Sequence, residues 1–396
     1  MNRKQLFCIF AIIICCLQGL AAQEANALLQ AYLRNFEKGG PDAKLRLIQD
    51  AADLDNPDLA PLFKRAVEFT VTTSERGKNV SLIRQFSLIA VEQCEKFKFE
   101  DARTVVWKLF LLDADSNVRM KTLKALGVIG KGDKLIVKSL NEWLAEQIES
   151  YKPGRDARTS LLIRCVMTLG ELNDESSFPV VFNVLHAGLS RDLDTVSRRV
   201  LSQMKGDFKP LLLDRIETGA ITIKRDALVV ALESDFLTDK EKGEVAEIAM
   251  KKALTTSSRD KNDLLALREI KVRANQALDA RSWSSATPLI LEYFNQALPE
   301  YDKGLTGKTE LLAIIHCLGN MNTHEAAQRL SVYLDFLNAY TDRTKVYDER
   351  IVLETVASLG RLGDKVAFDY LMNVKFLNYS ATIKTSADEA IKKLKW

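Results

Sequence analysis

The feature of this sequence that most restricts its fold is a small residue followed by Leu-Gly, which recurs where apolar helical stripes come to an end. Gly127 and Gly170 lie 43 residues apart, and Gly319 and Gly360 lie 41 residues apart. A repeat of about 40 to 47 residues is typical of solenoids of helix pairs, because one pair cannot bury its apolar stripe without a neighbour. The four copies are Ala125-Leu126-Gly127, Thr168-Leu169-Gly170, Cys317-Leu318-Gly319 and Ser358-Leu359-Gly360.

The stretches around these copies have the periodicity of amphipathic helices. From Leu161 to Leu172, apolar residues recur at steps of three, four and one, which places them on one helical stripe. Similar stripes run from Leu82 to Ala90 and from Val118 to Ile129, while alternating strand-like segments are nearly absent. The chain is therefore predicted to be all-α.

The best copy of the repeat runs from Asp113 to Asp133 and contains an Asp, a Val-Arg pair and a Leu-Gly helix end in that order. It resembles the HEAT-like repeat, an armadillo-type helical family, and the segment from Arg350 to Asp364 resembles the end of the same motif. Asp115 or Ser116 can cap the helix, Leu-Gly lets the chain leave it, and the interior alanine permits close helix approach. The resemblance implies an α-solenoid of stacked antiparallel helix pairs, similar to exported bacterial HEAT-repeat proteins.

Residues 23–396 are predicted to form one HEAT-like α-solenoid. At about 42 residues a pair, this length predicts about eight or nine helix pairs. The register is hard to follow in the middle of the chain, so irregular repeats are expected around 206–280. A capping helix is expected at 386–396, where Ser386 and Glu389 match a capping box and lysines near the end favour the helix dipole.

Residues 1–22 have the pattern of a secretory signal peptide. Arg3 and Lys4 precede an apolar run from Leu6 to Leu17, and Gly19-Leu20-Ala21-Ala22 follows it. That run is shorter than the roughly 20 residues that a membrane-spanning helix needs. We therefore expect a protein that is exported to the periplasm of a diderm bacterium or secreted, with no transmembrane helix after cleavage.

The cysteines argue against both a lipid anchor and a disulfide framework. Cys15 and Cys16 lie in the N-terminal apolar run, but Ile14 is not the small residue that usually precedes a lipidated cysteine, so a lipoprotein is not expected. An odd number of cysteines remains after cleavage, each within an apolar helical pattern. They are predicted to be buried thiols: Cys94, Cys165 and Cys317.

Charge and motifs predict neither nucleic-acid binding nor catalysis. The chain has 56 basic and 53 acidic side chains, a balance that argues against binding driven by net charge. With three histidines and no His-Glu-x-x-His, Cys-x-x-Cys or Gly-x-Ser-x-Gly pattern, no metal, cofactor or catalytic site is predicted. The segment from Asp302 to Thr309 ends like a phosphate-binding loop, but Asp302 stands where that motif needs glycine. A turn between paired helices explains it better.

One candidate partner site comes from aligning the helices of successive repeats. Three basic residues fall six residues before the same repeat position, and a fourth lies one turn away. Because stacked helices lie about 8 to 10 Å apart, this basic row could follow an extended acidic ligand. The alternative is an ordinary solvated face with charges of both signs. The basic row consists of Arg84, Lys121, Lys124 and Arg164.

A test of the basic row is the double substitution of Lys121→Glu and Arg164→Glu. On the sequence alone, it is expected to weaken partner capture and to leave thermal unfolding unchanged.

Two classes of function remain open. The first is an exported, non-catalytic scaffold that binds a protein partner through a concave helical surface, since solenoids offer long curved surfaces. An envelope complex is one candidate partner. The second is implied by the resemblance alone: HEAT-like repeats of this kind also occur in bilin lyase subunits that handle a tetrapyrrole, so a lyase or chaperone-lyase subunit is the alternative.

Overall fold

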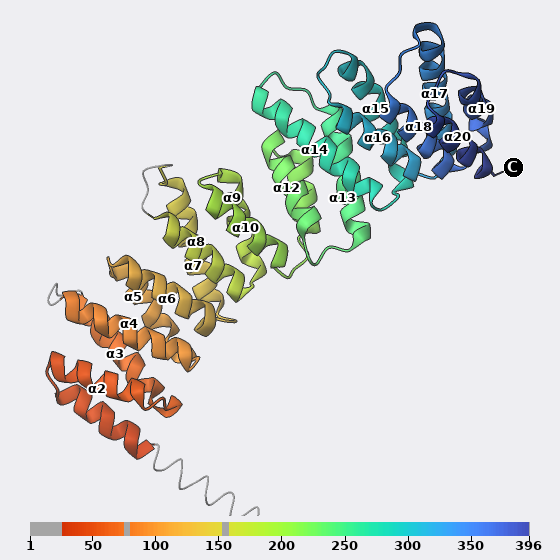
Figure 1. Ribbon diagram of the computed structural model, residues 1–396. Helices are drawn as coiled ribbons and strands as arrows, with labels where there is room; N and C mark the ends of the chain where they lie inside the picture. Colours follow the sequence, from red (N-terminus) through yellow and green to blue (C-terminus); the bar gives the residue numbers. More distant parts are fainter. Residues whose placement is uncertain (1–25, 75–79, 153–157, 396) are drawn as a thin grey trace, which may run out of the picture. The chain divides into compact units, whose positions relative to one another are not determined.

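A computed structural model describes residues 26–74, 80–152 and 158–395 of the chain (Figure 1). Residues 26–38 are helical, and helices α2 to α20 follow. The described residues contain no β-strand, and an isolated bridge joins Asp364 to Lys395. The predicted all-α fold is confirmed. The predicted signal peptide, with Cys15 and Cys16, lies outside the described residues.

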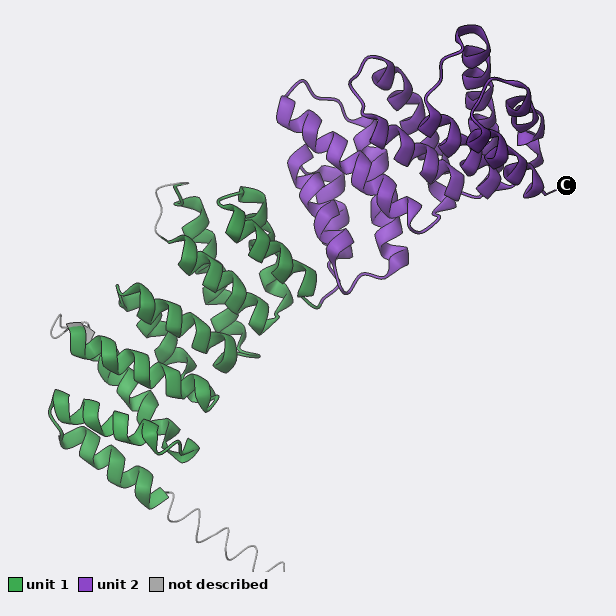
Figure 2. Cartoon of the chain, viewed as in Figure 1, with its two compact units in different colours: residues 1–205 green, residues 206–396 purple. Residues whose placement is uncertain are grey.

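The chain divides into two compact units, residues 1–205 and 206–396 (Figure 2). The first unit contains α2 (Pro41–Asp53), α3 (Ala60–Ser74), α4 (Val80–Lys96), α5 (Arg103–Leu112), α6 (Ser116–Ile129), α7 (Lys134–Glu149), α8 (Thr159–Leu172), α9 (Phe178–Ala187) and α10 (Arg191–Gln203). The second contains α11 (Lys209–Thr218), α12 (Ile221–Glu233), α13 (Asp239–Thr255), α14 (Lys261–Asp279), α15 (Thr287–Asp302), α16 (Lys308–Asn320), α17 (His324–Thr344), α18 (Glu349–Leu362), α19 (Phe368–Phe376) and α20 (Ala381–Lys392).

Within each unit the helices form a stack of pairs. Each odd-numbered helix from α3 onward packs against the even-numbered helix that follows it, and even-numbered helices also pack against one another, as α4, α6 and α8 do. This is the arrangement of an α-solenoid. The stretch 206–280, where irregular repeats are expected, holds α11 to α14, which form two pairs of the same kind.

The number of pairs agrees with the predicted eight or nine. Helices α3 to α20 form nine pairs, and α2 and the helix at 26–38 precede them. The length of a pair is not constant, because the helices range from the 9 residues of α19 to the 21 residues of α17.

The glycines of the Leu-Gly repeat do not end their helices, and that prediction is wrong. Gly127 and Gly170 lie inside the last turn of α6 and α8, as Gly319 and Gly360 do in α16 and α18. An added Cβ would lie 2.0 Å from the carboxylate of Glu171 at Gly127 and 3.0 Å from the Cβ of Ala390 at Gly360. The repeated glycine is therefore where one even-numbered helix approaches the next.

In two copies of the repeat, the residue two places before that glycine links the same helices by a hydrogen bond. Thr168 Oγ1 donates to the carbonyl of Leu123 at 2.9 Å, and Ser358 Oγ donates to the carbonyl of Ile315 at 3.1 Å. Both hydroxyl groups are buried, so each bond satisfies a polar group that water cannot reach. The small residue of the repeat thus serves packing between neighbouring pairs.

The predicted buried thiols are confirmed. Cys94, Cys165 and Cys317 are free and fully buried. Burial raises the pKa of Cys94 to about 12 and raises that of Cys165 further. These thiols stay protonated at neutral pH, which makes them packing groups and poor nucleophiles.

The C-terminal helix begins earlier than predicted. α20 starts at Ala381, and Ser380 caps it by accepting a hydrogen bond from the N–H of Ile383. Ser386 is therefore an interior residue, and the predicted capping box with Glu389 is wrong. The buried positions Ile383, Ala387 and Ala390 follow one helical face, and this face requires a helix that begins before residue 383.

Candidate functional site

The basic row lies on three successive even-numbered helices, α4, α6 and α8, as its spacing predicts. The structure pairs each member with a carboxylate. Two of these pairs join α4 to α6, between Lys121 and Glu92 at 3.2 Å and between Lys124 and Glu95 at 2.7 Å.

The other two members are paired as well. Arg84 lies 3.2 Å from Asp115, the N-cap of α6, and Arg164 contacts Glu171 within α8. The side chain of Arg164 is only 11% exposed. The row is thus a ladder of both signs in which the positive charge is neutralised locally. Partner binding by this row stays a prediction.

The second unit carries a groove that the sequence analysis did not identify. It has a volume of about 550 Å³ and lies between α15, α17 and the start of α18. We call it the aromatic groove, because five of its lining side chains are aromatic. The aromatic groove is lined by Leu298, Tyr301, Asp302, Arg329, Val332, Tyr333, Phe336, Leu337, Tyr340, Thr341, Tyr347, Asp348 and Ile351.

Helix α17 supplies the long side of the aromatic groove. Its lining residues recur at steps of three and four, which puts them on one face of the helix. Val332 is 52% exposed, Phe336 63% and Tyr340 41%. Tyr333 beneath them is buried and packs edge-on against Phe294, with ring centroids 5.1 Å apart. The exposed side chains therefore stand on a packed base.

Buried hydrogen bonds fix the other side of the groove. Tyr347 packs edge-on against Tyr379, with ring centroids 4.9 Å apart. Tyr379 is buried, donates to Asn338 Oδ1 at 3.1 Å and accepts from Thr341 Oγ1 at 3.1 Å. Burial raises the pKa of Tyr379 above its ordinary value. This network holds the wall without the need for a ligand.

Arg329 lies at the N-terminal end of the groove on α17. Its Nε donates to Asn295 Oδ1 at 2.9 Å, and its guanidinium lies 4.8 Å from the centroid of the Phe294 ring. Burial lowers the pKa of Arg329 from its ordinary value. Among the described residues, no carboxylate forms an ion pair with it, in contrast to Arg268 and Arg361.

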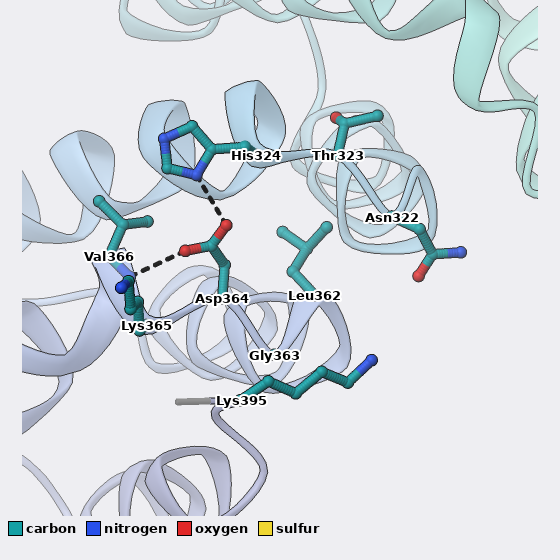
Figure 3. A pocket seen from close by; sticks show the side chains of 9 residues that line it. All are labelled: Asn322, Thr323, His324, Leu362, Gly363, Asp364, Lys365, Val366 and Lys395. Carbon is teal, nitrogen blue, oxygen red and sulfur yellow. Dashed lines mark hydrogen bonds and ion pairs between the residues drawn. The ribbon is translucent and has the colours of Figure 1, made fainter.

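A second pocket of about 490 Å³ lies at the ends of α16 and α18, beside Lys395 (Figure 3). His324 Nδ1 lies 2.7 Å from Asp364 Oδ2, and Asp364 Oδ1 accepts the N–H of Val366 at 2.9 Å. Burial by itself raises the pKa of Asp364, but these two hydrogen bonds hold it below its ordinary value. Asp364 is the N-cap of the short 3₁₀ helix Lys365–Ala367, so the contact with His324 holds a helix cap in place.

The phosphate-loop-like segment is the turn between α15 and α16, as predicted. Its polar groups are already engaged by carboxylates. Thr306 Oγ1 donates to Glu300 at 2.8 Å, and Lys308 Nζ lies 2.5 Å from Asp348. An anion at this turn would have to displace both bonds.

Within the described ranges, no three His, Cys, Asp or Glu side chains come together in a way that could hold a metal ion. None of the helices in the same ranges is both long and apolar enough to cross a membrane.

Comparison with known proteins adds no closer assignment. No protein-family model matches this chain, and no curated protein does. One similar solved structure concerns a phosphorylation switch that controls the interaction between cadherin and β-catenin, with 12% identity over 93% of this chain and 96% of that one and a TM-score of 0.28. Another is a circular tandem repeat protein, with 15% identity over 94% of this chain and 84% of that one and a TM-score of 0.17.

Proposed function

We propose that this chain is an exported, non-catalytic, HEAT-like scaffold that binds a protein partner, with the aromatic groove as its main contact surface. The observation that carries the proposal is the row of exposed side chains on α17, Val332, Phe336 and Tyr340, in a groove with a rigid base. Aromatic side chains are enriched at protein interfaces, where they bury a large area at a small entropic cost.

The groove suits binding better than chemistry. Its aromatic side chains offer contact area, and no serine, cysteine or histidine lines it beside the charged residues Asp302, Arg329 and Asp348. No arrangement of the described residues favours the bilin-lyase alternative over binding. The N-terminal sequence supports export, and buried free thiols are compatible with an oxidising compartment because they are inaccessible to oxidants.

The test is a pull-down from native envelope extract, with quantitative mass spectrometry of the retained proteins. The combined substitution of Phe336→Ser and Tyr340→Ser removes two exposed aromatic rings, so the fold should persist. We expect retention of the partner to fall at least about tenfold, as for other interface hot spots. The control is Leu264→Ser, which removes an exposed apolar side chain of α14 in the same unit. Equal retention by both variants would contradict the proposal.

A further inference from the structure

Resting on that proposed function, we infer which kind of segment the aromatic groove takes: an extended stretch of a partner protein with an acidic side chain beside apolar ones. The acidic side chain binds Arg329, and the apolar side chains lie over Phe336 and Tyr340. This names the chemistry of the partner, and three features of the groove carry it.

The first feature is the state of Arg329. Its Nε is committed to Asn295, and its face is committed to the ring of Phe294, so the guanidinium is held in one orientation. The Nη1 and Nη2 edge has no carboxylate partner among the described residues. That edge binds a carboxylate through two parallel hydrogen bonds, which are strongest when the arginine is already positioned and partly desolvated.

Other arginines of the same unit show what Arg329 lacks. Arg268 on α14 lies 2.6 Å from Glu310 on α16. Arg361 lies 2.8 Å from Glu354, and both are on α18. On α17 the corresponding protein contact is the neutral amide of Asn295. The missing negative charge at this end of the groove is therefore supplied by a ligand.

The second feature is the placement of the acidic residues. Asp348 is engaged by Lys308 and by the N–H groups of Arg350 and Ile351, so it is not available to a ligand. Asp302 lies seven residues after Asn295 on α15, about 10 Å further along the helix axis. A ligand carboxylate is thus attracted at the Arg329 end and repelled at the other end.

The third feature is the size of the groove. From Arg329 to Tyr340, α17 advances eleven residues, or about 16 Å, which is the length of about five residues of extended chain. A segment of about five extended residues therefore spans the groove from Arg329 to Tyr340.

The experiment is fluorescence anisotropy with the full chain and a fluorescein-labelled peptide of leucine, phenylalanine and aspartate. A twin peptide carries asparagine in place of aspartate. We expect the aspartate peptide to bind the wild type about tenfold more tightly than its twin, because the charged bidentate pair is replaced by a neutral contact. Arg329→Gln should abolish this preference and leave the affinity for the twin unchanged.

Two further variants make the result specific. Arg343→Gln, at an exposed arginine of α17 outside the groove, should keep the tenfold preference. Phe336→Ser with Tyr340→Ser should weaken both peptides about equally. Circular dichroism spectra of all variants should match the wild type, since every substituted side chain except Arg329 is exposed.

Several outcomes would overturn the inference. The aspartate peptide could fail to bind at concentrations up to about 1 mM, or the two peptides could bind with equal affinity. The preference for the aspartate peptide could also persist in Arg329→Gln. Sedimentation that shows a dimer for the wild type and a monomer for Phe336→Ser would make a second copy the occupant. If Arg329→Gln still retains the native partner while the Phe336 and Tyr340 variant loses it, the inference fails and the proposed function stands.

Discussion

Gly319 occupies a position on α16 that has no room for a side chain. A Cβ there would lie 2.7 Å from both the Cβ and the Oγ of Ser358 on α18. Ser358 cannot move away freely, because its hydroxyl donates to the carbonyl of Ile315. At the scale of single residues, the recurrent glycine is thus a contact between repeats.

Gly319→Ala should therefore destabilise the fold. Overpacking of this kind lowers the free energy of unfolding by about 1–3 kcal/mol. Gly307→Ala, at the N-cap of the same helix, is the control, because the nearest atom lies 4.0 Å from its added Cβ. It should cost less than about 1 kcal/mol. Urea denaturation followed by circular dichroism compares the two variants. An equal loss of unfolding free energy in both would contradict a close approach of α16 and α18 at Gly319.

Arg164 is the member of the basic row whose removal should change stability most. It contacts Glu171, which itself packs over Gly127, and its Nε donates to Thr168 at 3.3 Å. We expect Arg164→Gln to lower the melting temperature by about 2–4 °C. Lys124→Gln, at a half-exposed surface pair, should leave it nearly unchanged. Thermal melts would show this difference. Equal changes in melting temperature for the two variants would contradict a structural role for Arg164.

This changes the expectation for the double glutamate variant of the basic row. Glutamate at Arg164 would place a second carboxylate beside Glu171, so thermal unfolding should not stay constant, as the sequence alone suggested. Binding by the row is better tested with Lys121→Gln and Lys124→Gln, because both side chains lie nearer the surface.

At the scale of helices, a recurring ion pair joins equivalent elements of successive repeats. The first residue of a helix is basic, and it contacts the aspartate that caps the corresponding element about 30 to 40 residues later. A cation at a helix N-terminus opposes the helix dipole, and the capping carboxylate offsets this cost. The three ion pairs are Arg103–Asp133, Lys134–Asp174 and Lys308–Asp348, and His324 contacts Asp364 at the equivalent place.

These pairs predict a loss of stability in acid. Burial alone raises the pKa of Asp348, yet Lys308 and the N–H of Ile351 hold it below its ordinary value. The pKa values of Asp174 and Asp364 are lowered as well. A carboxyl group with a lower pKa in the folded state stabilises the fold above its unfolded pKa of about 3.9 and loses this effect as the pH falls through the folded pKa.

The check is urea denaturation at a series of pH values from about 6 to about 2. The wild type should lose stability below about pH 4, whereas Asp348→Asn should lose less across the same range. Asparagine retains the helix cap and lacks the titrating charge, which isolates the electrostatic part. The same acid dependence in both proteins would show that this pair does not contribute.

At the scale of the whole molecule, each compact unit has a hydrophobic core of its own. Phe86 and Phe110 are fully buried in the first unit, as Phe294 and Leu318 are in the second. In stacked repeats, stability is approximately a sum of repeat terms and interface terms between neighbours. A substitution in one unit should therefore lower the stability of that unit first.

Calorimetry of the intact chain should resolve two unfolding transitions. Gly319→Ala, in the second unit, should lower the temperature of one transition. Gly170→Ala, whose Cβ would lie 3.0 Å from Val200 in the first unit, should lower the other. A single transition that both substitutions shift equally would show that the chain unfolds as one cooperative body.

The sequence predicted those parts of the fold that depend on neighbours along the chain. Asp115 caps α6 by accepting hydrogen bonds from the N–H groups of Asn117 and Val118, as expected. Prediction failed at Ser386, because a capping-box pattern is short and the buried face of α20 had to begin earlier. It also missed the aromatic groove, although the steps of three and four from Val332 to Tyr340 were a readable signal.

The helical character of the chain, the pairing of its helices and the burial of its thiols could be read from the sequence, because helical periodicity and capping are local properties. The role of the repeated glycine, the charges that neutralise one another and the surface that is open to a partner became visible only once the helices were placed in space. Gly127 and Glu171, or Arg329 and Asn295, meet only after the helices stack. The physical reason is that such contacts join residues separated by one repeat, and their geometry depends on how closely two helices approach.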